Sequence, residues 1–316
     1  MAHSQRRPWA IILTLAGIVL LVVLWCAYWV IASGMLRERF EGERARLARG
    51  GIALECKAAH WGGFPFRFER DCVAPSLVAD GETIQAGNLL LVMQAYMPNR
   101  AIALIDGPVT TASGLTITHE RAMASARFSG LRSWQATLEA PKLRAPPYGS
   151  AERLLVSARD TGQDRLDVAL DAATAEILLD RGLLLKLDEV SLAGNVPREV
   201  IGRDLLAALA RGGGKIGISS LRLKKGDLVV TAKGEIGLST AGRLDGHLVT
   251  TTNRLDLLMA ELEQDFGLSD KDARTLGTMI GLMQPGKTTD VTVDLIAKDG
   301  KLYWGPVKLA ELPSVL

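Results

Sequence analysis

The sequence predicts a mainly β protein with helical insertions (α+β), preceded by one N-terminal transmembrane helix. Three observations predict this class: an uncharged apolar segment at residues 9–31, short alternating apolar runs between turn signals, and two amphipathic stretches. The 316 residues are enough for about two domains or one large β domain. We expect a cytoplasmic tail (1–8), the transmembrane helix (9–31), a helical juxtamembrane stalk (32–51) and a β-rich body (52–316).

The transmembrane helix is the first element. Residues 9–31 carry no charge and, as a helix, span roughly 34 Å, which covers a bilayer core of about 30 Å. The alternative is a cleaved signal peptide, but its apolar core is only about 7–15 residues long. Aromatic residues stand at both ends, as interfacial anchors do: Trp9 at one end and Trp25, Tyr28 and Trp29 near the other.

The charges on the two sides of this helix predict opposite orientations. Arg6 and Arg7 favour a cytoplasmic N-terminus, whereas five arginines between residues 37 and 49 favour the reverse. Cys56 and Cys72 can close a loop of about 16 residues, and disulfides persist in oxidising compartments such as a periplasm. Two buried thiols are the alternative. We predict the disulfide and a periplasmic body.

The stretch WGGFPFRFERDC follows the stalk helix, which Gly50 and Gly51 should end. Period-two spacing places Phe64, Phe66 and Phe68 on one face of a strand, and Pro65 makes it an edge strand or the start of one. We predict an ordinary core-facing aromatic strand. Direct contact of these rings with lipid is the alternative.

The body continues with short strands, turns and helices. Apolar or alternating runs predict strands at 89–93, 102–105, 115–118, 154–158, 166–170 and 183–187. Asp-Gly pairs predict hairpin turns at 80–81, 106–107, 245–246 and 299–300. One helix is predicted from Pro197 to Arg211, and a helical hairpin whose first helix is 255–266 and whose second is capped by Ser269 and stops at Pro285-Gly286. Pro146-Pro147 suggests two halves, 52–147 and 148–316.

The composition argues against several function classes. The chain has 37 Lys+Arg and 35 Asp+Glu, and Arg6 and Arg7 account for the whole excess, so the body is formally neutral and no nucleic-acid partner is expected. Residues 212–215 (GGGK) lack the upstream glycine and the Ser or Thr of a phosphate-binding loop. The four histidines show no ligand spacing, and no G-x-S-x-G motif occurs. We therefore predict no enzyme, no cofactor and no metal site.

Two stretches resemble known families. The motif GFPFRFE with its flanking cysteines, after a single span, resembles a bacterial family known only as a domain of unknown function. GRLDGHLVT (242–250) and KDGKLYWGPVKLAELP (298–313) resemble the end of AsmA-like envelope proteins. The resemblance implies a periplasmic, strongly curved antiparallel sheet, a half-barrel or groove, whose apolar concave face holds acyl chains.

These observations lead to two functional hypotheses. The first is a single-pass protein of the bacterial inner membrane that binds or handles lipid in envelope homeostasis, with membrane lipid as its partner. The second is a non-enzymatic scaffold or assembly factor that docks another envelope protein.

Overall fold

The computed structural model describes residues 8–79, 81–129, 133–160, 162, 164–178, 183–198, 215–264, 270–283, 290–304 and 307–311. The chain falls into two compact units, residues 1–105 and 106–316. The mainly β character is confirmed. Neighbouring strands among the described residues pair in antiparallel fashion.

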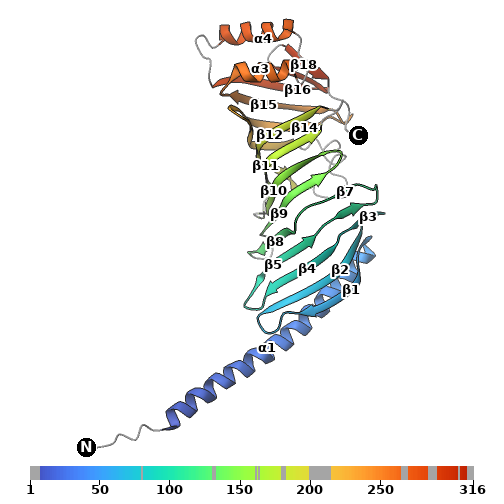
Figure 1. The fold of residues 1–316 in the computed structure, drawn as a ribbon, viewed down its shortest axis with the longest axis vertical. Coiled ribbons are helices and arrows are strands. Elements are labelled where there is room, and N and C mark those ends of the chain that lie inside the picture. The colour runs from blue at the N-terminus through green and yellow to red at the C-terminus, as the bar shows by residue number, and fades with distance from the viewer. Residues whose placement is uncertain are drawn as a thin grey trace, which may run out of the picture. The chain divides into compact units, whose positions relative to one another are not determined.

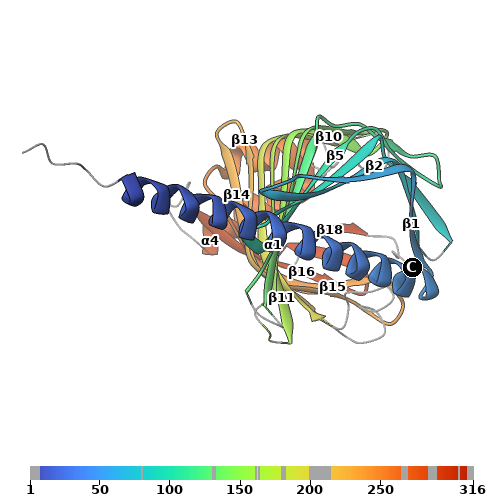
Figure 2. The same cartoon turned by 90° about the horizontal axis from the view of Figure 1, so that it is seen from below.

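The first unit begins with the long helix α1 (Pro8–Arg49). The predicted span and stalk are one uninterrupted helix, roughly 63 Å long at 1.5 Å per residue, whose final turns run beside β1 (Figures 1 and 2). It is long and apolar enough to cross a membrane, and its side chains from Ile11 to Leu24 are exposed. The helix ends where the sequence predicts: Gly50 N–H donates to the carbonyl of Leu47 (2.9 Å), and Gly51 has a φ of +87°.

Five strands complete the first unit. They are β1 (Ile52–Gly62), β2 (Arg67–Ala79), β3 (Glu82–Gln85), β4 (Asn88–Gln94) and β5 (Met97–Asp106, whose last residue belongs to the second unit). β2 pairs with β1 along one edge, and along the other with β3 and β4. The predicted strand at 89–93 is therefore confirmed as part of β4, and that at 102–105 as part of β5.

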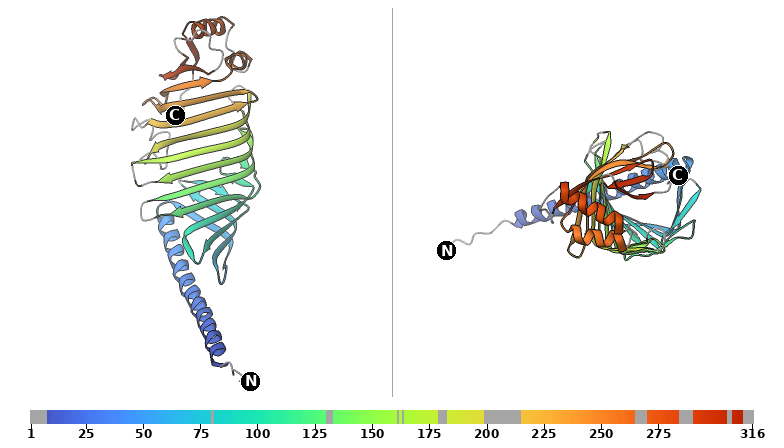
Figure 3. Two further views of the ribbon diagram at one scale, coloured as in Figure 1. Left: turned by 90° about the vertical axis from the view of Figure 1, so that its left-hand side faces the viewer. Right: turned by 90° about the horizontal axis from the view of Figure 1, so that it is seen from above.

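The second unit is a large antiparallel sheet with two helices near its C-terminal end (Figure 3). Its elements are β6 (Val109–Thr111), β7 (Thr116–Ile117), β8 (Ala122–Phe128), β9 (Trp134–Ala145), β10 (Gly149–Asp160), β11 (Arg165–Leu178), β12 (Leu184–Pro197), β13 (Lys215–Lys225), β14 (Leu228–Leu238), β15 (Leu244–Thr252), α3 (Leu255–Gln264), α4 (Asp270–Met283), β16 (Val291–Lys298), β17 (Lys301–Trp304) and β18 (Val307–Glu311). From β8 to β17 each strand pairs with the next in chain order.

The prediction of a strongly curved half-barrel is wrong, because the sheet is neither closed nor strongly curled. Glycine-associated register shifts do occur, at Ala193/Gly194 and between Ile218 and Leu221. They are local, however, because the long pairs from β9 to β12 keep one register throughout. Bending by bulges has to be repeated along a sheet to curl it, and here it is confined to a few strands.

The turn predictions had mixed outcomes. Asp299-Gly300 forms the two-residue turn between β16 and β17, with Lys298 opposite Lys301, so that hairpin is confirmed. The turn at 245–246 is wrong, because both residues lie inside β15. Gly246 is needed there for close approach, since a Cβ would lie 2.4 Å from the Glu235 carbonyl oxygen.

The remaining predictions concern helices and the chain division. α3 and α4 confirm the helical hairpin. β12 extends to Pro197, and residues 199–211, the rest of the other predicted helix, lie outside the described residues. Pro146 and Pro147 lie in the turn between the paired strands β9 and β10.

Candidate functional site

An apolar pocket lies between α3 and one face of the sheet in the second unit. Its volume is about 390 Å³, within the range usual for ligand sites. Its lining comes from seven elements, six strands and one helix: Leu185, Leu187, Leu223, Lys225, Leu228, Val230, Thr250, Leu258, Glu261, Leu262, Leu295, Leu302 and Trp304. Figure 1 shows α3 beside the C-terminal strands from which much of this lining comes.

Strand periodicity explains why these residues share one face. Leu185 and Leu187 on β12 are two residues apart, as are Leu228 and Val230 on β14, and residues two apart point to the same side of a sheet. On α3, Leu258 and Leu262 are one helical turn apart and face the strands together. The pocket therefore has an apolar floor on the sheet and an apolar wall on the helix.

Packing beyond the pocket holds α3 and α4 in place. Leu276 of α4, Val291 of β16 and Trp304 of β17 form a buried cluster, with exposed fractions of 1–5%. Leu258 and Leu262 of α3 pack against the same cluster. The pocket wall is thus part of a fixed core, and burial of large apolar side chains contributes roughly 1.5–3 kcal/mol each.

Two polar features interrupt the apolar lining. Lys225 of β13 forms an ion pair with Glu261 of α3, and both side chains remain about one-third exposed. Thr250 of β15 also lines the pocket, and its buried Oγ1 has no hydrogen-bond partner among the described residues. A buried hydroxyl without a partner is unusual in native proteins, because leaving it unsatisfied costs about 1–3 kcal/mol.

This arrangement suits an apolar molecule with one polar end. The lining can exclude water from a hydrocarbon chain, and the charged pair offers one cation and one anion to a polar group.

Within the described ranges there is no group of three His, Cys, Asp or Glu side chains able to hold a metal ion. His247 instead lies 3.0 Å from the Asp294 carboxylate on the neighbouring strand.

The predicted cysteine pair lies elsewhere, in the first unit. Cys56 of β1 and Cys72 of β2 form a disulfide with a Cα–Cα distance of 5.3 Å. Cys72 is buried, with 2% of its surface exposed. The bond joins two strands that already pair from Ile52–Ala79 to Gly62–Glu69.

The three predicted phenylalanines do not share one strand face. Only Phe68 lies on β2, where it is buried and stacks on Trp29 at 5.7 Å. Phe64 and Phe66 precede β2 in the turn after β1 and are about 60% exposed. The strand begins late because Arg67 N–H donates to the Gly63 carbonyl (2.8 Å), and Gly63, with a φ of +96°, closes a tight turn.

The predicted interface aromatics take different environments. Trp9 is 69% exposed near the start of α1. Trp25, Tyr28 and Trp29 instead contact the strand region of the first unit, and each donates a hydrogen bond of 2.9 Å to a backbone carbonyl: that of Pro65, Ala95 and Arg67, respectively. Trp29 is 8% exposed and belongs to a buried cluster with Phe68 and Ala95.

Local sequence reasoning missed the pocket altogether. Its residues are drawn from positions 185 to 304, and each strand contributes only one or two side chains. The available signals were the amphipathic pattern of α3 and the apolar alternation of β12 to β14, which predict a buried face but not a cavity.

Comparisons with known proteins identify a family and no function. No curated protein and no solved structure matches the chain. Nothing in the comparisons links it to AsmA-like proteins. Residues 29–313 match one family from the end of the apolar segment through α3, α4 and β18. The chain therefore belongs to the family described as "uncharacterized protein conserved in bacteria (DUF2125)".

Proposed function

We propose that this chain is a non-enzymatic, membrane-anchored protein of the bacterial envelope that binds the acyl chain of a lipid in the pocket beneath α3. The pocket carries the proposal: mainly Leu, Val and Trp side chains of the described residues line a volume of about 390 Å³. α1 would hold it at the inner membrane, where such lipids are available.

The polar features fit the same ligand. An acyl chain attached to a charged or ester-containing headgroup would place its chain against the leucines and its polar end near Lys225 and Glu261. A ligand oxygen could also satisfy the buried Thr250 hydroxyl. A relationship to AsmA-like proteins is part of this proposal, because the two stretches on which the resemblance rests, 242–250 and 298–313, contain Thr250, Leu302 and Trp304 of the pocket lining.

A periplasmic location of the body is part of the proposal. The Cys56–Cys72 disulfide supports it, because such bonds persist in oxidising compartments. The arginines that follow the span oppose a simple charge count, but long domains translocate largely regardless of flanking charge.

The test is photocrosslinking of a fatty acid to the full-length protein. The chain is purified from bacterial membranes and crosslinked with a photoreactive fatty acid, and labelled peptides are identified by mass spectrometry. We expect labelling of β12 to β14 or α3, and a several-fold loss in Leu262→Trp, which fills the pocket. Leu257→Trp is the matched control, since Leu257 lies on the same helix but does not line the pocket.

Two outcomes would contradict the proposal. Labelling spread evenly over the chain would show that the pocket takes no acyl chain. No fatty-acid labelling of the pocket, together with protein–protein crosslinking of α3 to another envelope protein in the same membranes, would favour the scaffold function instead.

A further inference from the structure

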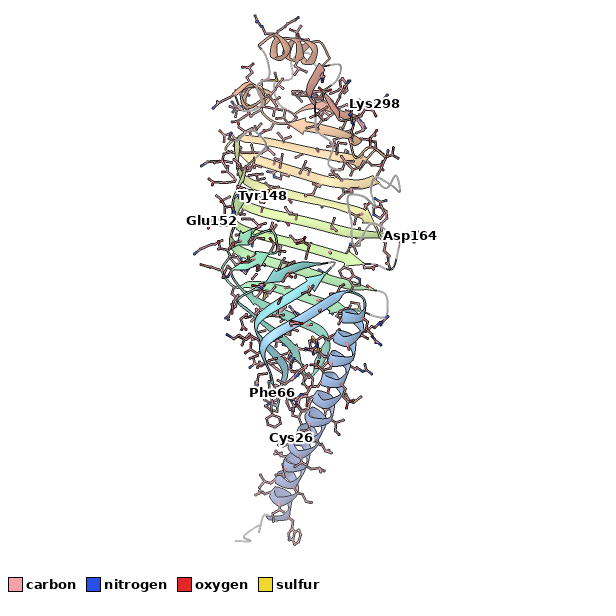
Figure 4. The ribbon with its side chains drawn as sticks, turned by 90° about the vertical axis from the view of Figure 1, so that its right-hand side faces the viewer. Cys26, Phe66, Tyr148, Glu152, Asp164 and Lys298 are labelled. Atoms are coloured by element: carbon pink, nitrogen blue, oxygen red, sulfur yellow. A yellow bond between two sulfur atoms is a disulfide. The ribbon has the colours of Figure 1, made fainter. Side chains whose placement is uncertain are left out.

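Two turns of the first unit lie directly against the C-terminal part of the apolar segment of α1, which carries Trp25, Tyr28 and Trp29. One turn comprises residues 63–66, between β1 and β2, and the other Ala95 and Tyr96, between β4 and β5. Ala95 N–H donates to the Phe66 carbonyl (2.9 Å), so the two turns form one tip, which together with Met97 at the start of β5 comprises residues 63–66 and 95–97. Figure 4 marks Phe66 at the end of these strands, close to the part of α1 that carries Cys26.

The tip presents an apolar surface. Phe64, Phe66 and Tyr96 are 58–62% exposed, and Met97 is 45% exposed. Large aromatic side chains grouped on an exposed turn are typical of contact with an apolar partner. Phe64 packs edge-on against Trp29 with ring centroids 5.1 Å apart, and Phe66 lies 6.3 Å from Trp25, which fixes both rings beside the helix.

The position along α1 indicates what the partner is. A bilayer core of about 30 Å that begins at Trp9 ends near Trp29, at 1.5 Å per residue. Trp25 and Trp29, which hold the tip, are therefore at the depth where the hydrocarbon gives way to headgroups. Val30 and Ile31 remain about 60% exposed at the same level, so the helix also presents apolar side chains there.

Five backbone carbonyls in and next to the tip have hydrogen-bond partners. Hydrogen bonds from Trp25, Tyr28 and Trp29 satisfy the carbonyls of Pro65, Ala95 and Arg67. The carbonyls of Gly63 and Phe66 accept from Arg67 and Ala95. Irregular backbone can enter the hydrocarbon region only when its polar groups have such partners, because each unsatisfied group there costs several kcal/mol.

We propose that this aromatic tip (residues 63–66 and 95–97) inserts into the outer part of the bilayer beside α1. The lipid that it contacts is the membrane around the anchor, and the tip holds the first unit at the membrane surface. The inference rests on the anchoring role of α1 in the proposed function and is independent of the pocket.

Site-directed spin labelling of the full-length chain tests the insertion. In a Cys26→Ala background, Phe66→Cys is labelled and reconstituted in phosphatidylethanolamine–phosphatidylglycerol vesicles. Accessibility to oxygen is then compared with accessibility to a water-soluble nickel chelate. Ile84→Cys is the control: Ile84 is also an exposed apolar residue of this unit, but it pairs with Leu77, roughly 33 Å along β2 from Arg67. We expect a several-fold higher oxygen-to-nickel ratio at position 66 than at position 84.

A third label separates the possible failures. Leu20→Cys, in the exposed middle of α1, reports the span itself. A deep label at position 20 with an aqueous label at position 66 overturns the tip insertion alone. Aqueous labels at both positions overturn the anchor. Spin–spin broadening at position 66 that disappears on dilution with unlabelled protein would show that the tip contacts a second copy, and it would also overturn the inference.

Discussion

At the scale of single residues, the hydroxyl of Thr250 distinguishes the pocket from the rest of strand β15. Its buried Oγ1 has no partner among the described residues, whereas the neighbouring Thr251 hydroxyl lies 2.9 Å from that of Thr292. Thr250→Val removes an unsatisfied polar group and keeps the shape of the side chain. We expect the ligand-free protein to gain about 1 kcal/mol in free energy of unfolding. If the hydroxyl binds a ligand, the Thr250→Val variant should retain less lipid than the protein with Thr250.

Thermal unfolding of delipidated protein and lipid counting by mass spectrometry check both effects. Thr251→Val is the control that breaks an existing interaction, and it should lower stability. Destabilisation by Thr250→Val would show that its hydroxyl has a partner within the protein.

Asp256 gives a prediction that depends on pH. The hydrogen bond from the Arg254 guanidinium, just before α3, lowers the pKa of Asp256 to about 2. Because the folded-state pKa is lower than that of the unfolded chain, this pair stabilises the fold above about pH 4, and the contribution disappears as the pH falls towards 2. Arg254→Gln should therefore flatten the acid side of the melting-temperature profile between these values. An unchanged profile would contradict the pairing.

At the scale of elements, two glycines with opposite requirements test the turn and helix assignments. Gly300 has a φ of +75° in the β16–β17 turn, so Gly300→Ala should cost about 1 kcal/mol. Gly277 lies inside α4, and a Cβ there would meet no atom within 4 Å, so Gly277→Ala should add about 0.5–1 kcal/mol. Thermal unfolding of the full chain measures both. The same sign for the two variants would contradict one of the assignments.

Local patterns predicted those elements whose signals are local. The uncharged run of α1, the Asp299-Gly300 turn and the α3–α4 hairpin each depend on residues close in sequence, and each is found. The turn predicted at Asp245-Gly246 was wrong because glycine occurs both in turns and where strands approach closely. Only the position of Glu235 on β14 distinguishes these two roles. The pocket could not be predicted, since it depends on which strands pair and on where α3 returns to the sheet.

At the scale of the whole molecule, the two units carry different functional surfaces. The aromatic tip and the disulfide belong to the first unit, and the pocket belongs to the second. Each proposal therefore has its own variants: Leu262→Trp in α3 should leave the depth of a label at position 66 unchanged. Substitution at the tip should likewise leave the labelling of the pocket unchanged.

Topology is the property that both proposals share, and a thiol-labelling experiment determines it. In a Cys26→Ala background, Ile84→Cys is exposed and should react with a membrane-impermeant maleimide in cells whose outer membrane has been permeabilised. Ser4→Cys, in the predicted cytoplasmic tail, should react only after lysis. Cys56 and Cys72 should react only after reduction, because their disulfide leaves no free thiol. The reverse pattern would place the body in the cytoplasm. It would also show that the arginines after the span, not Arg6 and Arg7, determine the orientation.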